Sequence, residues 1–112
     1  MKKSRVTITS TSAVETVNLR TQLVSVRVPS EKIEDDANDL ANFSIEVIGN
    51  DAQVTLTAKG AFAGSGFLAV SGGTFAISGG HQKIEGFALS ELKFTRTGTT
   101  SYTINITREI AE

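Results

Sequence analysis

The sequence contains no cysteine and no tryptophan, and it has one proline, one tyrosine and one histidine. Without cysteine, neither a disulfide framework nor a thiolate metal site can stabilise the chain, so packing or association must do so. The 11 basic and 12 acidic residues give a net charge of -1, so there is no broad basic field to attract nucleic acid or anionic lipid. We therefore expect neither nucleic acid nor a membrane among the partners.

Long hydrophobic runs are also missing. The longest stretch without charge, residues 60–82, is broken by two double glycines and several serines, which excludes a membrane-spanning helix. The start, Met1 to Arg5, is charged like the start of a signal peptide, but Val6 to Ser10 alternate between apolar and polar residues instead of forming an apolar run. We expect no export signal.

The uncharged stretch 60–82 is unusual because charged residues make up 21% of the chain. It contains a near-repeat in which a small apolar pair, a serine and two glycines at 69–73 recur at 76–80. Two such units are too few for a solenoid core, so a meander of short strands is the preferred interpretation. The uncharged residues must face a core, a partner or another copy of the chain.

Alternation of apolar and polar residues with a period of two predicts strands along most of the chain. Acidic residues and the spacing of Ile33, Ala37 and Leu40 predict one short helix, or an acidic loop, near residues 31–41. Two pairs of strands read as hairpins, 43–47 with 54–58 across Gly49-Asn50-Asp51, and 92–94 with 102–106 across residues 96–100. The other expected strands are 6–9, 14–19, 23–28, 67–70, 74–78 and 84–89.

Eight or nine short strands with almost no helix predict an all-β fold. We expect a single domain over residues 1–112, a β-sandwich or barrel with jelly-roll or Greek-key connections. Residues 1–5 are the candidate for a flexible N-terminal arm, because termini are loose unless they dock.

The sequence matches catalytic and ligand-binding motifs only incompletely. Residues 64–69 match the glycine pattern of a dinucleotide loop, but Ser71-Gly72-Gly73 interrupts the helix that such a loop requires. His81 would need carboxylates alone to complete a zinc site, and the acidic run 34–39 lacks the donor pattern of a calcium loop. We expect no enzymatic activity, no cofactor and no metal.

The stretch Phe87 to Ile106, with its Ser/Thr-rich strands and Thr-Gly-Thr turn, resembles the closing hairpin of small β-rich virion proteins of tailed bacteriophages. Among these it is most similar to head decoration, or cement, proteins. The resemblance implies a protein made in the host cytoplasm that binds the outer surface of an assembled capsid as a dimer or trimer. There it would stabilise the shell by bridging neighbouring copies of the major capsid protein, with many weak contacts acting together.

This interpretation assigns protein contacts to two groups of residues. Apolar residues of the uncharged region supply core and contact surface, in proportions that the sequence leaves open, and these are Phe62, Phe67, Leu68, Val70, Phe75 and Ile77. Lys2, Lys3 and Arg5 form either an arm that reaches an acidic neighbour or a solvated start. The alternative functions are a tail or baseplate component and a β-sandwich module that recognises a glycan or a host surface.

Overall fold

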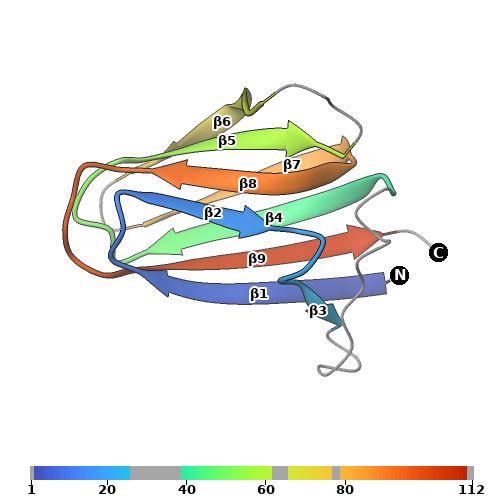
Figure 1. The fold of residues 1–112 in the computed structure, drawn as a ribbon, viewed down its shortest axis with the longest axis horizontal. Helices are drawn as coiled ribbons and strands as arrows, with labels where there is room; N and C mark the ends of the chain where they lie inside the picture. Colours follow the sequence, from blue (N-terminus) through green and yellow to red (C-terminus); the bar gives the residue numbers. More distant parts are fainter. Residues whose placement is uncertain (1, 26–38, 62–65, 77–78, 111–112) are drawn as a thin grey trace.

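A computed structural model describes residues 2–25, 39–61, 66–76 and 79–110 of the chain, and every regular element in these ranges is a strand. Figure 1 shows them as two stacked layers. The strands are β1 (Lys2–Ser10), β2 (Val14–Asn18), β3 (Val24–Ser25), β4 (Ala41–Ile48), β5 (Val54–Gly60), β6 (Leu68–Phe75), β7 (Gly80–Phe87), β8 (Leu89–Thr95) and β9 (Tyr102–Ile110).

The two sheets form a β-sandwich with jelly-roll strand order. One sheet runs β3-β1-β9-β4-β7 and the other runs β2-β8-β5-β6 (Figure 1). Every pairing is antiparallel. Apart from the short β3 at one edge, each sheet holds four strands, as in a double-sheet jelly roll. The predicted all-β fold is therefore confirmed, and of the alternatives left open the structure has a sandwich with jelly-roll connections.

The same alternation that predicted the strands builds the core. In β4 the side chains of Phe43, Ile45 and Val47 are buried, while the residues between them are exposed or half-buried. In β9, the odd positions between buried Tyr102 and Ile110 are half-buried. When apolar and polar side chains alternate along a strand, one face of the sheet is apolar and the other is polar. The apolar faces of the two sheets pack together, and the polar faces lie in solvent. The rings of Phe75 and Phe94, from β6 and β8, lie 6.3 Å apart in this core.

Neither predicted hairpin forms. β4 pairs with β7 and β9, whereas β5 pairs with β6 and β8 in the opposite sheet. The second expected pair is separated in the same way, because β8 pairs with β2 and β5 while β9 pairs with β1 and β4. A turn signal between two alternating strands is satisfied equally well by an arch that crosses from one sheet to the other. The resemblance to virion proteins described Phe87 to Ile106 as a closing hairpin. That part of the prediction is wrong, because the two strands lie in different sheets.

Three other local predictions have different outcomes. The two expected strands at 67–70 and 74–78 are one continuous strand, β6, with an irregularity inside it. The expected helix falls largely on residues 31–38, outside the described residues, while Asp39 and Leu40 are not helical and Ala41 opens β4. The expected flexible arm is wrong from Lys2 onward, because Lys2 to Arg5 pair in register with Ile110 to Thr107 of β9. In the described ranges, no helix has the length and apolar character to cross a membrane.

Candidate functional site: an apolar groove between two sheet edges

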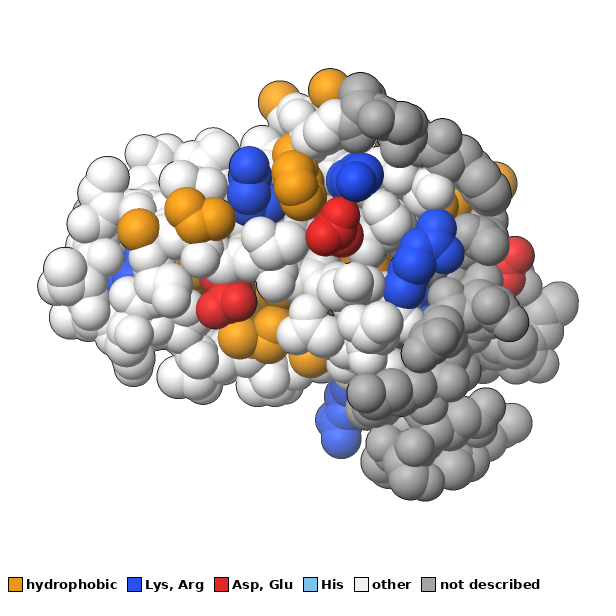
Figure 2. All heavy atoms as spheres, in the orientation of Figure 1, with side chains coloured by type: hydrophobic (Ala, Val, Ile, Leu, Met, Phe, Trp, Pro, Cys, Tyr) orange, Lys and Arg blue, Asp and Glu red, His pale blue; other side chains and the backbone are white. Residues whose placement is uncertain are grey.

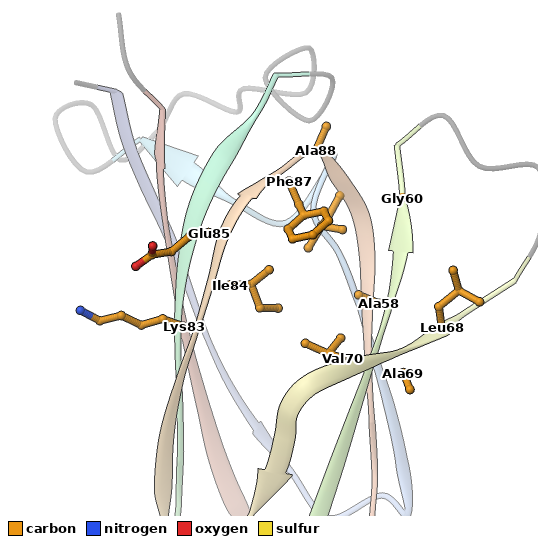
Figure 3. Close-up of a pocket in the computed structure, with 11 residues that line it drawn as sticks. Ala58, Gly60, Leu68, Ala69, Val70, Lys83, Ile84, Glu85, Phe87 and Ala88 are labelled. Atoms are coloured by element: carbon orange, nitrogen blue, oxygen red, sulfur yellow. The ribbon is translucent and has the colours of Figure 1, made fainter.

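An apolar groove opens where the two sheets separate. It lies between β6, the edge of the four-stranded sheet, and β7, the edge of the five-stranded sheet. Its volume is about 480 Å³. Figure 3 shows the lining residues, which are Ala58, Gly60, Leu68, Ala69, Val70, Lys83, Ile84, Glu85, Phe87, Ala88 and Leu89.

A break in the pairing of β6 shapes one wall of the groove. Two steps along β5, from Thr55 to Thr57, correspond to five steps along β6, from Thr74 to Ala69. The extra residues of β6 bend the strand (Figure 3), and Val70 points into the groove. Gly73 makes the bend possible, because a Cβ on this residue would lie 2.8 Å from the Leu56 carbonyl oxygen and 2.9 Å from the Val70 carbonyl oxygen. The wall therefore depends on a residue without a side chain.

A bulge in β7 shapes the other wall. Ala41 pairs with Phe87 and Phe43 with Ile84, so β7 has one more residue than β4 in this interval. Gly86 takes a φ of 76°, a left-handed conformation that favours glycine, and its N–H donates to Asn42 Oδ1 at 3.0 Å. Because the bulge resets the alternation, Phe87 turns its ring toward the groove beside Ile84 (Figure 3).

Large apolar side chains at this groove remain in contact with water. Leu68 is 64% exposed and Phe87 is 56% exposed, although buried Ile84 and Leu89 lie beside them. Covering apolar surface is favourable by roughly 25 cal/mol per Å². Among the described lining residues, only Lys83 and Glu85 are charged, and both side chains point away from the groove interior in Figure 3. This chemistry fits contact with apolar protein surface.

The predicted apolar contact residues divide between groove, outer face and core. Leu68 and Val70 line the groove. Phe67 is half-buried, with the Lys93 Nζ 4.6 Å from its ring centroid. Phe75 is fully buried and belongs to the core. Phe62 and Ile77 lie outside the described residues.

The predicted basic residues lie elsewhere. Lys2, Lys3 and Arg5 belong to β1, which β9 and β4 separate from β7. Lys3 forms an ion pair with Glu109, its cross-strand neighbour, at 3.4 Å. Arg5 is exposed. The structure therefore does not bring these residues together with the apolar group.

Phe87 is not among the contact residues predicted from the sequence. Its position two residues after Glu85 would place it on the outer, polar face of a regular strand. The only available signal was Gly86, since a glycine inside an alternating strand indicates a bulge.

His81 lies exposed on β7 and does not line the groove. Its Nε2 is 2.6 Å from Ser44 Oγ on the neighbouring strand, and it pairs in register with Glu46. Glu46 in turn accepts a hydrogen bond from Asn105 Nδ2 at 3.0 Å, and Asn105 Oδ1 accepts one from Thr7 at 2.7 Å. These groups form a polar row across the outer face of the sheet, where solvent reaches them. Within the described part of the chain, no three His, Cys, Asp or Glu residues are grouped to hold a metal ion.

A second, polar hollow of about 280 Å³ lies between Asn18, Arg20, Lys59 and Ser90. Its charged groups are engaged with the protein: Lys59 is 3.6 Å from the Glu91 carboxylate, and Arg20 Nη2 donates to the Ala61 carbonyl at 3.1 Å. Figure 2 shows Lys and Arg side chains interspersed with acidic and hydrophobic ones on one face of the molecule, without a basic patch among the coloured residues.

Comparisons with known proteins add a fold likeness only. No protein-family model matches the chain, and no curated protein matches it. The globular domain of a zebrafish complement 1qA protein aligns with a TM-score of 0.49 and 9% identity, covering 99% of this chain and 98% of that chain. A chain from Bacillus endospore appendages, described as a novel family of disulfide-linked pili, aligns with a TM-score of 0.46 and 10% identity, covering 99% and 92%. Similarity this low says nothing of function, and the jelly-roll assignment rests on the strand order of this chain.

Proposed function

We propose that this chain is a non-enzymatic structural protein that docks onto a larger protein assembly through the open edge of its jelly roll. The observation that carries the proposal is the groove between β6 and β7, with Leu68 and Phe87 exposed at its rim. Exposed apolar side chains that surround a concave surface are typical of protein contact sites. Such docking needs no reacting group, and the groove lining supplies only one lysine and one glutamate.

The assembly in this proposal is the head of a tailed bacteriophage. The resemblance of Phe87 to Ile106 to head decoration proteins supports this assignment, and the first residues of that stretch, Phe87, Ala88 and Leu89, line the groove. The protein binds the outer surface of the shell and bridges neighbouring copies of the major capsid protein. Contacts that are weak singly are repeated around the shell, and a protein that binds only the assembled form stabilises it by mass action.

The test is cosedimentation with purified, assembled heads of tailed phages. We expect the protein to pellet with heads that lack a decoration layer and to stay in the supernatant with unassembled coat protein. Leu68→Asp places a charge at the groove and should reduce the bound fraction at least about tenfold, since burying an unpaired charge is costly.

Leu40→Asp is the matched control, because Leu40 is 70% exposed and does not line the groove. It should bind heads like the unaltered protein. Equal loss in both variants would contradict docking through the groove, and an unaltered protein that ignores every head preparation would contradict the proposed function.

A further inference from the structure

β7 is an edge strand with an unused side. It is eight residues long and pairs with β4 on one side, and no described strand pairs with the other. It contains no proline, and its residues from Gly80 to Ile84 keep regular register with β4. A regular edge of this kind presents unpaired N–H and C=O groups that another strand can bind.

The two charged residues of β7, Lys83 and Glu85, can form opposite-charge pairs with the same two residues of a second, identical strand. Lys83 and Glu85 are separated by one residue, Ile84, and point to the same side of the sheet (Figure 3). When two identical strands pair antiparallel about a twofold axis at Ile84, Lys83 of each copy lies opposite Glu85 of the other. Shifting the axis by one residue places Lys83 opposite Lys83, or Glu85 opposite Glu85, and like charges in direct opposition destabilise a strand pair. The charge pattern therefore selects one symmetric register.

We propose that the partner at this edge is a second copy of the same chain, joined β7 to β7 with the twofold axis at Ile84. The five-stranded sheets of the two copies then form one continuous sheet. A twofold axis perpendicular to this sheet leaves both four-stranded sheets on the same side of it, so the two β6 edges also approach each other. In this register residue 87 of each copy lies opposite residue 81 of the other, so the two grooves lie on opposite sides of the axis and stay open for contact with the shell.

The β7 bulge limits the length of this pairing, and the symmetry of the contact limits the assembly to a dimer. Beyond Glu85 the strand bends at Gly86, where the N–H is already engaged with Asn42. Bulges bend and twist the strand and so keep an edge from extending pairing indefinitely. The contact is isologous, meaning that each copy uses the same surface, so two copies consume the edge and no filament grows.

This dimer deepens the proposed function, and the role of the dimer on a shell rests on that function. A dimer carries two equal shell-binding faces, and bridging neighbouring coat subunits requires two such faces. The dimer itself can be tested in solution without any shell.

The experiment measures molar mass by sedimentation equilibrium over a range of concentrations for the full chain, whose monomer mass is 11.9 kDa. The unaltered protein should approach twice this mass. Lys83→Glu and Glu85→Lys should each raise the dissociation constant roughly tenfold or more, because each creates two like-charge pairs across the axis. The double variant, Lys83→Glu with Glu85→Lys, should restore dimerisation because it restores opposite charges in the same register.

Phe87→Ser and Leu40→Ser each alter an exposed apolar side chain outside the charge pairs, and both variants should stay dimeric. Circular dichroism confirms that each variant is folded. A monomeric unaltered protein, a trimer, or a dimer that ignores both single charge reversals would overturn the proposal. A monomer that still pellets with heads would overturn the dimer alone, whereas a dimer of the expected charge dependence that never binds heads would overturn the proposed function alone.

Discussion

Arg96 shows how a single residue holds one end of the sandwich together. Its side chain is buried, its Nη1 is 3.0 Å from Asp51 Oδ1, and its Nε donates to the Ser12 carbonyl at 3.3 Å. The guanidinium also lies 4.2 Å from the Tyr102 ring centroid. Because these groups come from three connections between the sheets, Arg96 ties together arches that have no strand pairing of their own.

Asp51 makes this contact dependent on pH. The backbone N–H of Thr99, and then that of Thr100, hydrogen-bond to its carboxylate and lower the pKa of Asp51 below its ordinary value of 3.8. A group with a lowered folded pKa stabilises the fold above the unfolded pKa, and that contribution is lost as pH falls through the folded pKa. We expect Asp51→Asn to lower the midpoint of thermal unfolding at pH 7, and the difference from the unaltered protein to shrink as pH falls below 3.8.

Thermal unfolding followed by circular dichroism at a series of pH values checks this expectation. Asp39→Asn, which alters another exposed aspartate, should leave the midpoint at pH 7 unchanged. A difference between Asp51→Asn and the unaltered protein that is the same at pH 7 and pH 3 would contradict the account.

At the scale of elements, the irregularities of the edge strands create the groove. β6 carries extra residues relative to β5, and β7 carries one extra residue relative to β4. In the middle of a sheet, such irregularities would disrupt pairing on both sides, whereas at an edge they disturb one neighbour only. The groove is therefore a property of the two edges.

Gly73 provides a test of the β6 wall. Gly73→Ala brings a methyl group against two backbone carbonyls, so the bend must shift, and we expect a loss of about 1–3 kcal/mol in the free energy of unfolding. Urea unfolding measures it. Gly66→Ala is the matched control, because a Cβ there meets no atom within 4 Å, and its effect should stay within about 0.5 kcal/mol. Equal stability of the two variants would mean that β6 does not require a glycine at its bend.

At the scale of the whole molecule, one core joins the two sheets. Phe94 of β8 is fully buried and packs near Phe75 of β6, while Ile45 and Ile106 line the facing sheet. With no cysteine in the chain, this packing must supply the stability that disulfides supply in other small domains.

Phe94→Ala should therefore cost about 3–5 kcal/mol, a large part of the roughly 5–15 kcal/mol that stabilises a typical domain. Phe87→Ala removes an exposed phenylalanine and should cost less than about 1 kcal/mol. Chemical unfolding at low protein concentration compares the two without a contribution from dimerisation. Comparable losses would show that the inner faces are not packed as described.

Much of the architecture is encoded locally and could be predicted from the sequence. The alternation of Phe43, Ile45 and Val47 identifies a strand with one buried face, whatever its partner, because side chains alternate along every strand. The scarcity of helical periodicity, together with turn residues at short intervals, was enough to predict an all-β fold. For the candidate site, the uncharged region contains Leu68 and Val70, which line the groove, and their contact role stays a prediction.

The tertiary structure alone decided which strands pair and where the apolar groove lies. Val6 pairs with Ile106 and Thr55 with Thr95, and the period of two that marks a buried face says nothing of such distant partners. The groove exists only because β6 and β7, adjacent in the chain, end at the edges of opposite sheets, and because a bulge at Gly86 turns Phe87 from the outer face toward the groove. The local pattern of residues thus determined the faces of the strands, and long-range pairing determined which of those faces remained uncovered.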